Sequence, residues 1–109
     1  MPSQERVLDV LETGARVVVA FRNTNTWDYH ILAKCEDEID GIIETYAFET
    51  LVFDLSNLKM MSSTLLGILV HLYKSGLKIR LRNPTESVRE ILETTELYRV
   101  LPVDPGNNA

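Results

Sequence analysis

The sequence predicts an α/β domain with a mixed, mostly parallel β-sheet of four to five strands and three to four helices. Short apolar, β-branched runs alternate with longer segments in which apolar residues recur every three or four positions. The resulting strand–helix–strand order implies right-handed crossovers between parallel strands. The 109 residues have room for one hydrophobic core but not for two, so we expect a single domain over residues 1–109.

The first half of the chain is expected to form two strands and one helix. Residues 6–11 form a short strand or a helical turn, and the β-branched run 15–21 forms a central strand. The polar segment 22–28 has the composition of a loop. An amphipathic helix follows over about 29–47, because apolar residues alternate there with acidic ones at helical spacing. The apolar side consists of Leu32, Cys35, Ile39, Ile42, Ile43 and Tyr46, and the solvated side of Glu36, Asp37, Asp40 and Glu44.

The second half continues the alternation. A strand is expected over 50–55, followed by a strongly apolar helix over 63–75, which Gly76 ends. Residues 77–81 alternate between apolar and basic side chains, which predicts a strand with one face inward and a basic face outward.

A third helix is expected to begin after this strand. Asn83 is the predicted N-cap, Pro84 the first helical residue, and Glu86 the acid that completes a capping box. Residues 104–109 are expected to form a loose tail.

Composition and charge exclude several classes of protein. The 11 basic and 16 acidic residues give a net charge of -5, with no basic stripe that could neutralise the phosphates of a nucleic acid. No apolar run approaches the roughly 18 residues of a membrane span, and no signal peptide is recognisable. We therefore expect a cytoplasmic protein. The single cysteine, Cys35, fits a small core residue better than a reactive thiol.

Motifs of catalysis and cofactor binding are missing from the sequence. It contains no G-x-S-x-G, P-loop, G-x-G-x-x-G or H-E-x-x-H pattern and no Cys–His pair. His30 and His71 lie too far apart in the pattern to suggest a metal pair. We expect neither an enzyme nor a cofactor or metal site.

Ser62 and Ser63 lie where the second predicted helix begins. Unpaired backbone N–H groups and the helix dipole favour negative charge there, so a phosphate on either serine would be well placed. The simpler interpretation is that one of them is the N-cap. The two interpretations are compatible.

Two residues before the first predicted helix are also candidates for function. Asp28 fits an N-cap, or alternatively an acid that contacts a partner. Trp27 fits a half-buried loop anchor, or a binding hot spot if it is exposed.

Three motifs then suggest a family. An apolar strand runs into Asp54-Leu55-Ser56-Asn57-Leu58, and a short apolar step leads to Ser62-Ser63-Thr64-Leu65-Leu66-Gly67. Farther on come Gly76 and a segment from Pro84 to Leu97. In this order they resemble the D-L-S-x-V, D-S-S-G-L-G and S-P-E-V-R-E-x-F-E-x-T-G-L patterns of the STAS domain, the family of bacterial anti-sigma factor antagonists. Ser62 stands in place of the family's Asp, and Leu65 and Glu96 in place of glycines.

The resemblance implies a STAS-like domain that binds a serine kinase doubling as an anti-sigma factor, and that loses the partner when a serine is phosphorylated. By position the phosphoacceptor is Ser63, with Ser62 and Thr64 as alternatives. The partner-binding residues would be Trp27, Asp28, Ser62, Ser63, Thr64 and Leu66. Two alternatives remain open: a scaffold or homo-oligomer subunit without the switch, and more weakly a nucleotide- or small-ligand-binding domain.

Overall fold

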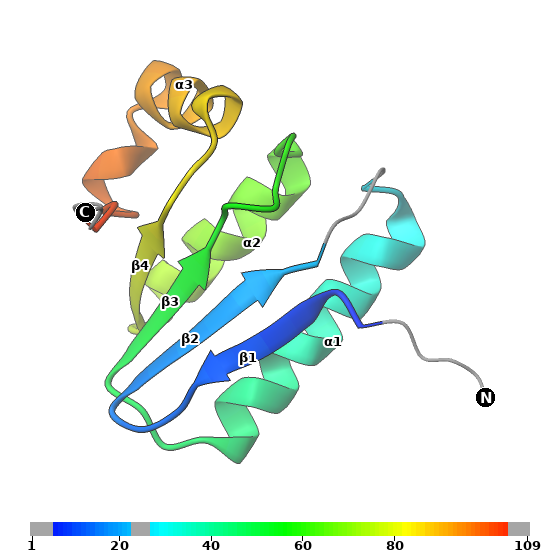
Figure 1. The fold of residues 1–109 in the computed structure, drawn as a ribbon, viewed down its shortest axis with the longest axis vertical. Coiled ribbons are helices and arrows are strands. Elements are labelled where there is room, and N and C mark those ends of the chain that lie inside the picture. Colours follow the sequence, from blue (N-terminus) through cyan, green and yellow to red (C-terminus); the bar gives the residue numbers. More distant parts are fainter. Residues whose placement is uncertain (1–5, 23–26, 105–109) are drawn as a thin grey trace.

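The computed structural model describes residues 6–22 and 27–104 and contains the predicted sheet (Figure 1). Its strands, in spatial as in sequence order, are β1 (Leu8–Glu12), β2 (Arg16–Phe21), β3 (Thr50–Asp54) and β4 (Lys78–Arg82). β1 pairs antiparallel with β2, whereas β3 runs parallel to both β2 and β4. The α/β class and the mixed, mostly parallel sheet are therefore confirmed, and residues 8–12 form a strand rather than a helical turn.

Helices follow the strands as expected. They are α1 (Tyr29–Thr45), α2 (Ser63–Lys74) and α3 (Glu86–Thr95), with a 3-10 turn η1 (Leu97–Arg99). Figure 1 shows α1 and α2 packed side by side behind the sheet, and α3 beyond the carboxyl end of β4. One core cluster joins the sheet to all three helices. Its fully buried side chains include Phe21, Ile39, Leu51, Phe53, Leu65, Leu69, Leu81 and Leu92.

Cys35 lies inside this core, as predicted. Its side chain is fully buried on the sheet-facing side of α1. Burial, with smaller contributions from the charges of Glu38 and Glu36, raises the pKa of the Cys35 thiol to about 12. A thiol held neutral in this way is a packing residue and not a nucleophile.

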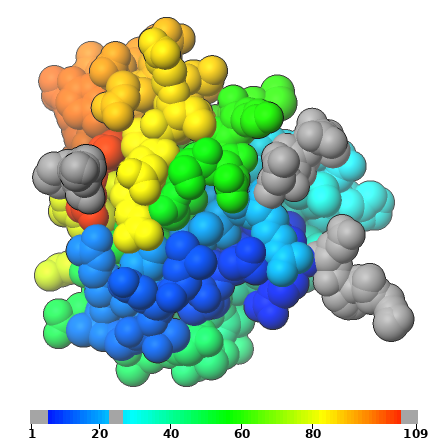
Figure 2. Space-filling view, viewed as in Figure 1, coloured from blue at the N-terminus to red at the C-terminus, as the bar shows by residue number. Residues whose placement is uncertain are grey.

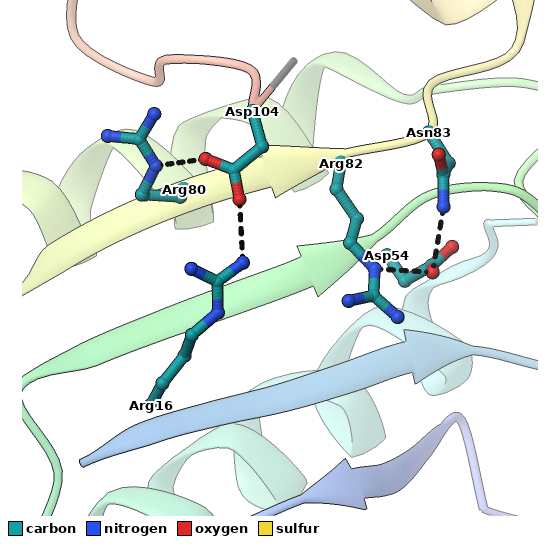
Figure 3. A network of polar contacts seen from close by, with 6 residues as sticks. All are labelled: Arg16, Asp54, Arg80, Arg82, Asn83 and Asp104. Carbon is teal, nitrogen blue, oxygen red and sulfur yellow. Dashed lines mark hydrogen bonds and ion pairs between the residues drawn. The ribbon is translucent and has the colours of Figure 1, made fainter. Parts of the chain in front are cut away.

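In the described part of the chain, no helix covers the opposite face of the sheet (Figure 1). Val18 and Val52 on this face are nevertheless 0% exposed. They lie in register with Arg80, and Figure 3 shows arginines of β2 and β4 extended across the strands toward two carboxylates. Long arginine side chains on such a face can cover apolar neighbours with their aliphatic stems. In Figure 2 side chains of the blue and yellow strands and the red C-terminal segment meet on this surface.

The start of the third helix differs from the prediction. Thr85, not Asn83, is the N-cap of α3, because its side-chain oxygen accepts from the N–H of Val88. Asn83 adopts a left-handed backbone with φ of 54°, and its side chain donates to Asp54. Asn tolerates this backbone, so its amide is free to support the preceding strand instead of the helix. Pro84 consequently precedes the helix, and Glu86 is its first residue.

Asp104, the first residue of the expected loose tail, is held in place by several contacts. Val103 forms a parallel bridge with Leu81, and the N–H of Asp104 donates to the Leu81 carbonyl at 2.7 Å. Asp104 also pairs with Arg16 and Arg80. The remainder of the expected tail, 105–109, and most of the expected loop, 23–26, lie outside the described residues.

Candidate functional site

The candidate site is the carboxyl edge, by which we mean the segments that follow β2, β3 and β4. Parallel strands point their carboxyl ends to the same side, so these three segments are neighbours in space (Figure 1). All three α-helices begin at this edge, with Asp28, Ser62 and Thr85 as N-caps. The arrangement gathers the predicted residues of segments 27–28 and 62–66 at one end of the domain.

Asp54, at the end of β3, anchors the segment that leads to the serines. The residue is 6% exposed. One oxygen accepts from the backbone N–H and the hydroxyl of Ser56, at 2.9 and 2.7 Å. The other accepts from Nε of Arg82 at 2.8 Å and Nδ2 of Asn83 at 3.2 Å (Figure 3). Asp54 thereby joins the ends of β3 and β4 to the segment 55–62.

These hydrogen bonds also set the ionisation of Asp54. Burial on its own raises the pKa of the carboxyl, but the donors from Ser56, Arg82 and Asn83 outweigh it, so this pKa lies below its usual range. The D-L-S motif is therefore a structural clamp in which Asp54 stays ionised. Its partners Arg82 and Asn83 are 28 and 29 residues away along the chain. The only sequence signal for these partners was an Asp at the end of an apolar strand.

The two serines have different structural roles. The Ser62 hydroxyl accepts from the N–H of Leu65 at 2.9 Å and is the N-cap of α2, which confirms that one of the pair caps the helix. Ser63 is the exposed first residue of α2, and its hydroxyl has no hydrogen bond to any described residue. Thr64 is exposed as well.

Trp27 and Asp28 join the same edge from the β2 side. The Asp28 carboxylate accepts from the N–H of Ile31 at 3.0 Å, so its predicted role as N-cap of α1 is confirmed. Trp27 is half-buried, as a loop anchor should be: its ring packs edge-on against Phe21, and its indole N–H donates to the Met60 carbonyl at 3.1 Å. This hydrogen bond fixes the segment before α1 against the segment before α2.

Leu65 and Leu66 are both buried. Leu65 is fully buried, so the bulk it adds in place of the family's glycine lies in the core and not beside Ser63. Leu66 is 8% exposed and offers little surface to a partner. Two residues that the sequence reasoning missed offer more: Met60 is 57% exposed and Tyr29 81%. The short apolar step before Ser62 was the available signal for Met60.

The chemistry at this edge is that of binding. Exposed hydroxyls, a capping carboxylate and large apolar side chains suit a protein surface. Among the described residues no group of three His, Cys, Asp or Glu side chains could hold a metal ion. None of the helices in residues 6–22 and 27–104 has the length and apolar character needed to cross a bilayer.

Comparisons with known proteins bear on the family and the fold of the chain. The STAS domain model matches residues 4–107. Among solved structures, the anti-sigma factor antagonist SpoIIAA in its unphosphorylated form matches with a TM-score of 0.68 and 18% sequence identity. That match covers 91% of this chain and 89% of the SpoIIAA chain, and it shows a shared fold. No curated protein matches the sequence. Since the family model spans nearly all of the sequence, the chain belongs to the STAS domain family.

Proposed function

We propose that this protein is a cytoplasmic bacterial anti-sigma factor antagonist that binds a serine kinase of the anti-sigma type at its carboxyl edge and is released when Ser63 is phosphorylated. One observation carries the proposal: Ser63 is exposed and its hydroxyl is not engaged by the described residues. The resemblance of its segment to the family motif implies that Ser63 stands at the position of the phosphorylated serine. The fold shared with the anti-sigma factor antagonist SpoIIAA, whose matching structure is of the unphosphorylated form, supports a switch of this kind.

A phosphate on Ser63 would act on the partner and leave the fold intact. At the first position of α2 it would face unpaired backbone N–H groups and the positive end of the helix dipole. It would add a charge of roughly -2 to a surface that already carries the Asp28 carboxylate. Release of the partner would follow from charge repulsion and bulk at the interface.

The proposed partner surface centres on Ser63 and extends in two directions. Trp27 and Asp28 form the side toward β2, and the exposed Met60 lies on the segment that Trp27 holds. Thr64 continues the surface along α2. The hydrogen bond between Trp27 and Met60 links the two sides, and a link of this kind lowers the ordering cost of binding.

The first test is intact-mass and peptide mass spectrometry of the protein recovered from its native cells. We expect one phosphate, located on Ser63. Crosslinking in the same cells should then capture a serine kinase with S63A at least as well as with the parent, and weakly with S63D. The matched control is Ser87, an exposed serine in the first turn of α3, where S87A and S87D should both capture the kinase normally.

A second candidate is a constitutive scaffold that keeps the fold and lacks the switch. The observation that favours it is Ser62, which keeps the capping function of the family's Asp but removes an acid beside the acceptor. In this case the protein stays unmodified through growth, stress and starvation, and S63A and S63D capture the same partners. That pair of results would replace the first proposal with the second.

A further inference from the structure

A cationic groove lies at the β4 edge of the sheet, away from the carboxyl edge. Its volume is about 750 Å³, and it opens between the turn from α2 to β4 and the segment that follows η1. Four cations line it, Lys74, Lys78, Arg80 and Arg99, and no described Asp or Glu does. Tyr73 and Leu77 add apolar surface. In a chain of net charge -5, this groove concentrates positive charge in one place.

Two of these cations are not neutralised within the domain. Arg80 pairs with Asp104, and Arg99 pairs with Glu96. Lys74 and Lys78 form no ion pair with any residue in the described ranges. The groove therefore offers unpaired positive charge beside apolar side chains, a composition suited to an acidic protein surface.

The outer face of α1 has the complementary charge. Glu36, Asp37, Asp40 and Glu44 are exposed on the side opposite the core, and none forms an ion pair with a described residue. Glu36, Asp40 and Glu44 follow one another at intervals of four, a spacing at which like charges repel along a helix. The row extends for about 12 Å. Cations from another molecule would relieve this repulsion, and the exposed Gly41 between the acids allows close approach.

We infer that the cationic groove of one copy of this chain binds the acidic face of α1 of a second copy. The occupant is a copy because the same chain carries four cations on one surface and four acids on the other. α1 lies behind β1 and β2 while the groove lies at β4, the opposite edge of the sheet (Figure 1). Two different surfaces then meet at each contact, so the contact repeats from copy to copy and forms rings or open chains.

This association does not depend on the proposed function. The groove lies at the C-terminal end of α2 and Ser63 at its N-terminal end, and a helix of 12 residues is about 18 Å long. Each assembled copy keeps its carboxyl edge open. Loss of the phosphorylation switch and loss of the association are therefore separate results, measured on different variants.

Sedimentation velocity of the full chain tests the inference through a charge exchange. In about 0.1 M salt, where the Debye length is about 10 Å, the parent should sediment as a dimer or a larger assembly. In about 1 M salt it should sediment as a single chain. The groove variant K74E/K78E removes the net positive charge of the groove, and the helix variant D37K/D40K removes the net negative charge of the α1 face. Each should be a single chain alone, and an equimolar mixture should form a pair, because the intact groove of the helix variant can still bind the intact α1 face of the groove variant.

The control is E90K/E93K, which reverses two exposed acids on α3 and should associate like the parent. Circular dichroism checks that every variant is folded. A parent that stays a single chain at low salt overturns the inference, and so does a groove variant that associates like the parent. If both reversed variants are single chains and their mixture is too, the groove does not receive α1 of a copy, and the inference is equally wrong.

Discussion

Asp104 accepts a hydrogen bond from Arg16, which lies 88 residues earlier in the chain, at 2.7 Å between Nη2 and Oδ2. The other Asp104 oxygen pairs with Arg80, so one carboxylate joins β2, β4 and the C-terminal segment across the face that no described helix covers (Figure 3). Burial alone raises the pKa of Asp104, but the hydrogen bonds from Arg80 and Arg16 prevail and hold that pKa below its usual range. Asp104 thereby holds Arg16 and Arg80 in place on this face.

Replacement of Asp104 by Asn should destabilise the fold. D104N keeps the size of the side chain but leaves two arginines without their carboxylate, and we expect a loss of about 1–2 kcal/mol in the free energy of unfolding. Urea denaturation measures it, and hydrogen exchange at the Leu81 and Asp104 amides should show the local release. D9N, which removes the exposed ion pair between Asp9 and Arg22, is the control and should cost less than about 1 kcal/mol. Equal losses for both variants would contradict a special role for Asp104.

Acid should destabilise the protein through Asp54 and Asp104. Both have a folded-state pKa below the ordinary value of 3.8, so their stabilisation is complete above that value. As the pH falls below it, the unfolded chain binds protons first, and stability is lost until the folded-state pKa is passed. D54N should be less stable near neutral pH, by about 1–3 kcal/mol, and should lose less of its remaining stability between about pH 5 and about pH 3.

Urea titrations of the parent and D54N across that pH range measure both effects. E90Q, a change at an exposed residue of α3, is the control, and its curve should run with that of the parent. A D54N curve that declines as steeply as the parent's would mean that Asp54 does not contribute to acid unfolding.

The fold was predictable because its local signals agree with one another. The β-branched run of β2 and the alternation of apolar and basic residues in β4 each matched the buried and exposed faces found. Three-and-four spacing placed Cys35 and Ile39 in the core. Such periodicities depend only on which side of an element faces the core, and a sequence displays that directly.

The polar clamps were not predictable because they join residues that are distant along the chain. Asp104 belongs to a segment with the composition of a loose tail. The parallel bridge from Val103 to Leu81 brings it to Arg80. Asn83 has the local signature of an N-cap, but a tertiary partner, Asp54, takes its side chain. The serines and Asp28 could be predicted as candidates because each lies at the start of a predicted helix. The contact between Trp27 and Met60 could not be predicted, because these residues are distant along the chain.

Ser62 and Ser63 should separate cleanly in stability measurements. S62A removes the cap of α2 and should cost about 1 kcal/mol. S63A removes a hydroxyl that no described residue engages and should change stability by less than about 0.5 kcal/mol. S63D places a negative charge in the first turn and should stabilise by about 0.3–1 kcal/mol, an effect that salt reduces. A destabilised S63D would mean that phosphorylation acts by unfolding the helix and not by blocking the partner.

Glu96 stands where the STAS pattern has a glycine, and the structure gives it the backbone that glycine prefers. It ends α3 in the left-handed conformation with φ of 61°. A residue with a Cβ pays about 1–2 kcal/mol for that conformation, and the lower entropy of its unfolded chain offsets part of the cost. E96G should therefore raise the free energy of unfolding by about 0.5–1 kcal/mol, even though the exposed pair with Arg99 is lost.

The control is E93G: Glu93 is an exposed residue of the same helix with right-handed backbone, and glycine there should cost about 1 kcal/mol. Opposite signs for the same substitution three residues apart would establish that backbone conformation, not charge, decides the effect, and a destabilising E96G would refute it.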